Sequence, residues 1–187
     1  MKRIVILASG SGTLAQAIFD AHLEADIVAV ISDQRDAAVL DRAHNARIET
    51  FTIPMLPDRA EWDRELETLI AALKPDLVVS AGFMRILSER ITSKFRIINS
   101  HPALLPLFPG AHAVRDALAT GATETGTTIH WVDAGVLHLL TRNNHQPKKG
   151  YLFKGNCSTH FLFPVRVQQL FLQQMAAHLL NPLRIDG

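Results

Sequence analysis

Two residues near the middle of the chain, Asn99 and His101, have side chains suited to acyl transfer. They lie two positions apart at the end of an apolar run, so in extended backbone both side chains project to the same side. An asparagine amide can donate a hydrogen bond to a developing oxyanion, and a histidine can carry a proton to a departing amine near neutral pH. Asn99 and His101 are therefore candidate catalytic residues. The alternative is that His101 only bonds a backbone carbonyl at the end of a strand.

A glycine-containing loop near the N-terminus, SGSGT at residues 9–13, has the composition of an anion site. Its two glycines let the backbone turn tightly before a helix, and amides at a helix N-terminus attract a phosphate. With Gly10, Gly12 and Ala15 the same segment also fits G-x-G-x-x-A, which is typical of a dinucleotide site, and Asp33 would be its ribose-binding acid. The loop by itself leaves a phosphate ester, a dinucleotide and a purely structural turn open.

The elements that must position these residues can be predicted from the alternation of apolar runs and helical segments. Short β-branched runs predict strands at residues 3–7, 27–31, 48–53, 77–81 and 96–100. Segments of helical period predict helices at residues 14–25, 37–45, 59–73, 88–95 and 112–119. This order predicts an α/β fold with a doubly wound, mostly parallel twisted sheet and helices on both faces. In such a sheet, ligands bind at the carboxyl ends of the strands.

Bulk composition favours a soluble, cytoplasmic protein that acts on small molecules. The 187 residues are 48% apolar and 20% charged, with a formal net charge of +1, so no nucleic-acid partner is expected. No apolar run approaches the roughly 20 residues needed to cross a bilayer, so no membrane association is expected. The single cysteine, Cys157, cannot form an internal disulfide, which fits a reducing compartment. Formation of a homo-oligomer is left open.

The composition changes near Val136. Residues 137–187 hold 6 of the 19 Lys and Arg but only 1 of the 18 Asp and Glu. We therefore expect two parts, a catalytic domain at residues 1–136 and a divergent tail at residues 137–187. Within the tail, residues 164–180 could form an amphipathic helix.

Several segments of the first part together carry a specific pattern: ASGSGT at 8–13, AGFMRIL at 81–87, NSHPALLP at 99–106, PGAH at 109–112 and GTTIHWVDAGV at 126–136. They resemble the folate-dependent formyltransferases, in particular those that formylate phosphoribosylglycinamide in purine synthesis. The resemblance covers residues 1–136. It implies transfer of a formyl group from 10-formyltetrahydrofolate, as co-substrate, to the substrate amine, without a metal.

The resemblance also implies binding roles for two groups of residues. It places the ribosyl phosphate on Gly12, Thr13 and Leu14. It places the folate on one arginine, one four-residue loop and the asparagine: Arg59, Met84, Arg85, Ile86, Leu87 and Asn99. The alternatives are that Arg59 is a solvated residue at the start of a helix and that residues 84–87 are core packing with one exposed arginine.

In the implied reaction, Asn99 and His101 stabilise the tetrahedral oxyanion, and protonated His101 or a relayed water helps to expel the folate nitrogen. The family pattern then continues with an aspartate in an Asp-x-Gly-Pro stretch, which favours the protonated histidine. This chain has Leu137-His138-Leu139-Leu140 instead, and leucine cannot accept a hydrogen bond, so we expect proton transfer to be impaired. Asp133 is a candidate substitute for the aspartate. A shift of reading frame near Val136 would explain both the change of composition and the loss of the family pattern. The alternative is a genuine basic extension.

Other functions must be weighed against this one. A catalytically inactive protein could retain the phosphate and folate sites. A formyltetrahydrofolate hydrolase, which releases formate, or a formyltransferase for a different amine could share the architecture. A nicotinamide-dependent oxidoreductase would use Gly10, Gly12, Ala15 and Asp33, but it would leave the segment at residues 99–106 without a role.

Overall fold

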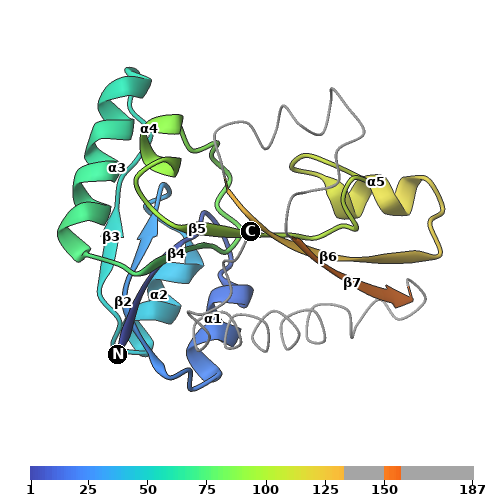
Figure 1. The fold of residues 1–187 in the computed structure, drawn as a ribbon, viewed down its shortest axis with the longest axis horizontal. Helices are drawn as coiled ribbons and strands as arrows, with labels where there is room; N and C mark the ends of the chain where they lie inside the picture. The colour runs from blue at the N-terminus through green and yellow to red at the C-terminus, as the bar shows by residue number, and fades with distance from the viewer. Residues whose placement is uncertain (133–149, 157–187) are drawn as a thin grey trace, which may run out of the picture.

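A mostly parallel sheet forms the centre of the protein (Figure 1). The structure is a computed structural model, and it describes residues 1–132 and 150–156. Within these residues the sheet has seven strands in the order β3-β2-β1-β4-β5-β6-β7. The strands are β1 (Lys2–Leu7), β2 (Ala25–Ser32), β3 (Thr50–Thr52), β4 (Leu77–Ser80), β5 (Ile97–His101), β6 (Glu124–Trp131) and β7 (Gly150–Asn156). The first five are parallel, whereas β6 and β7 are antiparallel to their neighbours.

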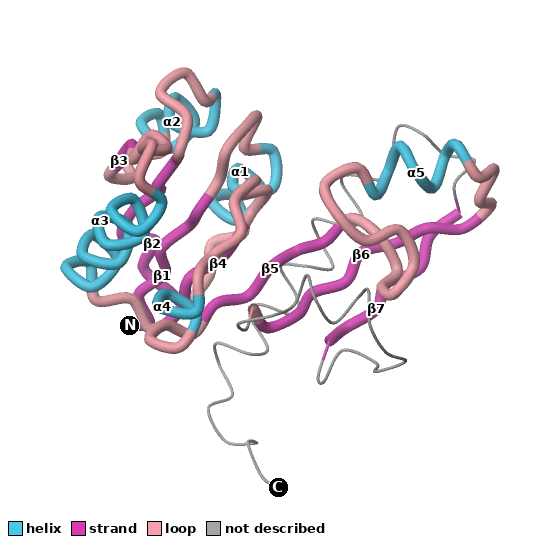
Figure 2. The backbone as a smooth tube through the Cα atoms, turned by 90° about the horizontal axis from the view of Figure 1, so that it is seen from above, coloured by secondary structure: helices cyan, strands magenta, loops and turns pink. Residues whose placement is uncertain are grey.

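Helices cover both faces of the sheet (Figure 2). They are α1 (Thr13–Asp20), α2 (Ala38–Asn45), α3 (Arg59–Leu73), α4 (Glu89–Thr92) and α5 (Ala113–Ala119). Buried residues of α1 and α2 pack in one hydrophobic cluster with Ile4 and Ile6 of β1. Buried residues of α3 and α4 pack in a second cluster with Val5 and Leu7. The expected doubly wound α/β fold is therefore confirmed.

The carboxyl ends of three adjacent strands form one edge of the sheet. Leu7 of β1 is in register with Ser80 of β4, and Ser80 is in register with Asn99 of β5. Because these strands are parallel, the chain leaves all three at the same edge. The 9–13 loop, the loop at residues 82–87 and the segment after His101 are thus neighbours in space, although they are far apart in the sequence.

Most predicted elements lie close to the observed ones, and the differences have physical causes. Helix α3 spans the predicted 59–73, because Asp58 caps its first amides and Lys74 takes a left-handed conformation at its end. The predicted helix at 14–25 was too long: α1 ends at Asp20, because β2 begins at Ala25 to pair with β1. The predicted helix at 88–95 shortens to α4. Strands β6 and β7 were not predicted, and the expected helix at 164–180 lies outside the described residues.

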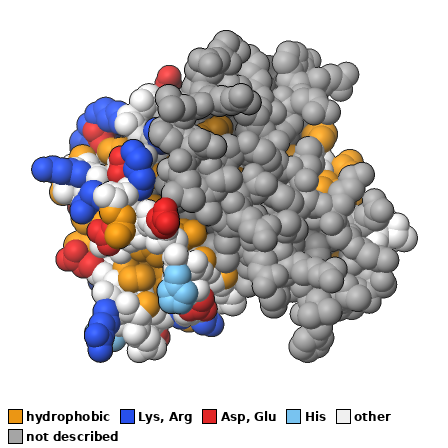
Figure 3. Space-filling model, turned by 60° about the horizontal axis from the view of Figure 1, so that its bottom comes forward, with side chains coloured by type: hydrophobic (Ala, Val, Ile, Leu, Met, Phe, Trp, Pro, Cys, Tyr) orange, Lys and Arg blue, Asp and Glu red, His pale blue; other side chains and the backbone are white. Residues whose placement is uncertain are grey.

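The surface of the described part carries charges of both signs. On the face shown in Figure 3, basic and acidic side chains lie interspersed, and neither sign gathers into one continuous patch there. Among the described residues, none of the helices is both long and apolar enough to cross a membrane.

Candidate active site

The 9–13 loop turns tightly where β1 meets α1. Gly12 has a left-handed backbone with φ of 69° and forms the N-cap of α1. A Cβ atom at this position would lie 2.5 Å from Cγ2 of Val39 in α2, so the glycine also permits close packing of α1 against α2. Arg42 of α2 donates to the Ser11 carbonyl at 2.8 Å and holds the loop from the same side. The loop geometry thus depends on α2 as well as on its own sequence.

An open pocket of about 380 Å³ lies beside this loop. It is lined by residues of the loop and of the segment between β2 and α2: Ser9, Gly10, Ser11, Gln34, Asp36, Ala37 and Ala38. Gly12 is buried, Thr13 is exposed, and Leu14 packs against the α1–α2 cluster. Leu14 can therefore offer a ligand its backbone amide but not its side chain.

Residues 82–87 form a loop between β4 and α4, which we call the 82–87 loop. Phe83 and Leu87 are buried in the cluster with α3, and the Phe83 ring stacks on Trp62 with ring centroids 6.3 Å apart. Between them, Met84 and Ile86 expose 62% and 64% of their surface. The alternative of core packing with one exposed arginine at residues 84–87 thus fits only Leu87, because Met84 and Ile86 present two apolar side chains to solvent and Arg85 is partly buried.

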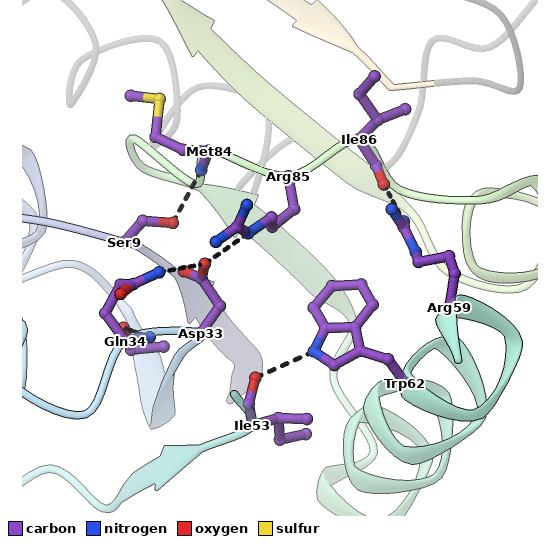
Figure 4. Close-up of polar contacts among 10 residues, drawn as sticks. Ser9, Asp33, Gln34, Ile53, Arg59, Trp62, Met84, Arg85 and Ile86 are labelled. Atoms are coloured by element: carbon purple, nitrogen blue, oxygen red, sulfur yellow. Dashed lines mark hydrogen bonds and ion pairs between the residues drawn. The ribbon is translucent and has the colours of Figure 1, made fainter. Parts of the chain in front are cut away.

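Three elements hold the 82–87 loop in place (Figure 4). The Ser9 hydroxyl, at the end of β1, accepts a hydrogen bond from the Met84 amide at 2.8 Å. The Arg59 guanidinium, at the start of α3, donates to the Ile86 carbonyl and pairs with Asp63 at 3.0 Å. Arg59 is thus not a freely solvated surface residue.

The third contact is an ion pair between Arg85 and Asp33. Arg85 Nε lies 2.6 Å from Asp33 Oδ2, and the carboxylate also accepts from the Gln34 amide at 2.9 Å. Burial by itself would raise the pKa of the Asp33 carboxyl, but Ser9, Gln34 and Arg85 together outweigh it, and the pKa lies below its ordinary value. The Asp33 side chain has no exposed surface, so it cannot reach a ribose hydroxyl as the dinucleotide interpretation requires.

Asn99 forms a side-chain pair with His130 of β6. The two residues are in register across the antiparallel β5–β6 pair, and Asn99 Nδ2 lies 3.2 Å from His130 Nε2. His130 Nδ1 lies 3.1 Å from the Trp131 carbonyl, which can only accept. Nδ1 therefore carries the proton, and Nε2 accepts from the Asn99 amide. This contact fixes which way the Asn99 amide points.

His101 is the last residue of β5 and is partly buried. Its Nε2 lies 2.9 Å from the Phe108 carbonyl, so this nitrogen donates, and Nδ1 is the basic nitrogen of the neutral ring. Burial lowers the pKa of His101, and the hydrogen bond with Phe108 opposes this only in part. Thr128 of β6 supports the segment after His101, because its hydroxyl donates to the Ala103 carbonyl at 2.7 Å and accepts from the Leu105 amide at 3.0 Å.

The catalytic candidates and the 82–87 loop lie on the same face of the sheet. Ile97 belongs to the α3–α4 cluster, whereas Ile98 belongs to the α1–α2 cluster. Because side chains alternate along a strand, Asn99 and His101 follow Ile97 onto the α3–α4 face. Phe83 and Leu87, at the two ends of the 82–87 loop, pack into the cluster on that face.

Sequence reasoning missed three polar residues that support the site, namely Ser9, Thr128 and His130. His130 and Thr128 stand two positions apart in GTTIHW, the same spacing as Asn99 and His101. This spacing could have indicated a second pair of site residues. The register that places them opposite β5 is seen only in the tertiary structure. Asp133 and the segment 137–140 lie outside the described residues.

The fold is that of a doubly wound α/β protein, and its candidate catalytic residues lie at the carboxyl edge of the sheet. Residues 2–137 match the family model described as formyl transferase. The chain therefore belongs to the formyl transferase family.

Individual relatives agree with this membership. Phosphoribosylglycinamide formyltransferase of Mycobacterium tuberculosis is 48% identical over 140 residues, which cover 71% of this chain and 65% of the relative. The Escherichia coli enzyme of the same name is 44% identical over 137 residues, covering 69% and 65%. The crystal structure of glycinamide ribonucleotide transformylase 1 from Symbiobacterium toebii superposes with a TM-score of 0.85 at 31% identity, covering 100% of this chain and 92% of that one. The aligned part thus spans about 65% of the length of these two curated relatives.

Proposed function

We propose that the chain transfers a formyl group from 10-formyltetrahydrofolate to the amine of phosphoribosylglycinamide, a step of purine synthesis. The observation that carries this proposal is the common face of Asn99, His101 and the 82–87 loop at the carboxyl edge of the sheet. A donor held by that loop would present its formyl carbon to the two polar side chains. The names of the aligned relatives support the choice of donor and acceptor.

Each binding group has a part in this proposal. Gly12, Thr13 and the Leu14 backbone receive the ribosyl phosphate at the N-terminus of α1. The apolar surface of the folate contacts Met84 and Ile86. The folate site is completed by Leu87, Arg85, Arg59 and Asn99. All of these groups border the same edge of the sheet.

The proposed mechanism follows from the hydrogen bonds of the two catalytic candidates. The amine attacks the formyl carbon, and the Asn99 amide, already oriented by His130, donates to the oxygen that becomes negative. Neutral His101 accepts the amine proton at Nδ1 and delivers it to the folate nitrogen as the carbon–nitrogen bond breaks. The products are the formylated amine and tetrahydrofolate.

The test is a formyl-transfer assay on the full chain, with phosphoribosylglycinamide present or omitted. We expect acceptor-dependent turnover, and we expect His101→Ala to lower it by about 10²- to 10⁴-fold, as for loss of a general acid–base group. Binding of phosphoribosylglycinamide should be retained, because the 9–13 loop follows a different strand. Formate release without acceptor would identify a hydrolase instead.

A second candidate function is ligand binding without turnover. It is favoured by the surroundings of His101, whose ring bonds a backbone carbonyl and no carboxylate among residues 1–132 and 150–156. A folded chain that binds both ligands and transfers no formyl group would establish this alternative.

A further inference from the structure

A buried carboxylate at the end of β2 holds the 82–87 loop from two strands away. Asp33 follows Ser32, the last residue of β2, and β1 lies between β2 and β4 in the sheet. Arg85 therefore reaches across the end of β1 to place its Nε 2.6 Å from Asp33 Oδ2 (Figure 4). The contact joins residues 52 positions apart in the sequence.

The ion pair determines which way the centre of the loop faces. Arg85 turns inward and keeps 33% of its side chain exposed, whereas its neighbours Met84 and Ile86 remain largely exposed. A buried carboxylate without a partner is costly, so Asp33 strongly favours the conformation in which Arg85 points toward it. The backbone then directs Met84 and Ile86 away from the protein, where they can contact a ligand.

Asp33 cannot contact the ligand itself. Its carboxylate has no exposed surface, and Arg85 and Gln34 both occupy the Oδ2 atom. The other two contacts that hold the loop are made with its backbone, from Ser9 to the Met84 amide and from Arg59 to the Ile86 carbonyl. Between these two backbone contacts lies Arg85, and Asp33 is the residue that holds the Arg85 side chain.

We propose that Asp33 is a positioning residue for folate binding: by anchoring Arg85, it holds the 82–87 loop in the conformation that receives the pterin part of 10-formyltetrahydrofolate. This inference rests on the proposed function for the identity of the ligand. It also gives Arg85 a second role in the proposed folate site, as the partner of Asp33.

The test compares Asp33→Asn with Asp26→Asn in the full chain. Asp26 is a matched control because it also pairs with an arginine, Arg3 at 3.8 Å, but it is exposed and lies at the opposite end of β2 from Asp33. Isothermal titration with 10-formyltetrahydrofolate should show an affinity about tenfold weaker for Asp33→Asn, the factor that corresponds to about 1.4 kcal/mol. The affinity for phosphoribosylglycinamide should change less than about twofold in both variants. A purely structural role of Asp33 would instead weaken the binding of both ligands.

Hydrogen exchange provides a readout that needs no ligand. The Met84 amide should exchange faster in Asp33→Asn than in the wild type, and at the wild-type rate in Asp26→Asn. Unchanged exchange and unchanged folate affinity in Asp33→Asn would overturn the positioning role. A wild-type chain that binds no folate while Asp33→Asn still exchanges faster would overturn the proposed function and leave Asp33 as an anchor of the loop alone.

A second variant covers the case in which Asp33→Asn does not fold. Arg85→Lys keeps a positive charge for Asp33 but replaces the planar guanidinium, so the carboxylate stays paired while the geometry of the loop changes. We expect it to fold with weakened folate affinity and unchanged affinity for phosphoribosylglycinamide. Wild-type affinity for both ligands would contradict the proposal.

Discussion

His101 makes the stability of the protein depend on pH. Because burial lowers its pKa, the folded protein keeps the imidazole neutral at a pH where the unfolded chain has begun to bind a proton. The stability that depends on neutral His101 is therefore fully present above the ordinary histidine pKa. It is lost as the pH falls through that value toward the lower pKa of His101 in the folded state. The carboxylate of Asp33 stays ionised in this range, since its pKa is lowered from an already acidic value.

We expect the free energy of unfolding to decrease between about pH 7.5 and pH 5.5. In His101→Asn the decrease should be smaller, because that variant lacks the group that titrates. Urea denaturation of both proteins at several pH values measures the difference. Equal losses in the two proteins would show that other groups cause the dependence on pH.

At the scale of elements, the packing of α1 against α2 determines the shape of the 9–13 loop. Gly12→Ala would place a methyl group against Val39 and force an alanine into a left-handed backbone. We expect a loss of about 2–4 kcal/mol of stability, from overpacking and backbone strain together. Chemical denaturation provides the measurement.

The double variant Gly12→Ala, Val39→Ala tests how much of this loss the Val39 methyl groups cause. Val39→Ala removes Cγ2, which would lie 2.5 Å from the added Cβ atom, but it keeps Cβ and Cα at 2.6 and 2.8 Å. The clash should therefore be relieved in part, and the double variant should be somewhat more stable than the sum of the two single changes predicts. Strict additivity would mean that the Val39 methyl groups do not limit position 12.

The whole molecule combines a front part typical of the family with a tail of different composition. The family match ends at residue 137, close to the point where acidic residues become scarce. We still propose that residues 137–187 are a divergent tail and that a shift of reading frame near Val136 produced it. A reading frame of the gene that restores Asp-x-Gly-Pro would support this origin, and its absence from every frame would exclude it.

A substitution at the position after Val136 tests how far the tail limits activity. Leu137→Asp should raise formyl transfer, because a carboxylate placed as in the family pattern would stabilise protonated His101. The measurement is the rate of acceptor-dependent transfer, with Leu139→Asp as a control of the same charge. No gain, or an equal gain in the control, would show that the lack of an aspartate at this position does not limit the rate.

Much of the fold could be predicted from the sequence because its signals are local. Asp58 and Lys74 give α3 its two ends, and continuous apolar runs mark the strands that are covered on both faces. The ends of α1 and α4, which are shorter than predicted, were harder to predict, because a helical pattern does not show where the next strand begins. Strand β7 lies in the part of the chain that was expected to be unrelated, and its pairing with β6 could not be read from composition.

The sequence by itself determined the chemistry available to this protein. The glycines of the 9–13 loop, the spacing of Asn99 and His101, and the alternation of helices and strands are all readable within short segments. The tertiary structure alone decided the partners of these groups, such as Arg85 for Asp33 and His130 for Asn99. The physical reason is that these contacts depend on the order and register of strands far apart in the chain, which no local pattern specifies.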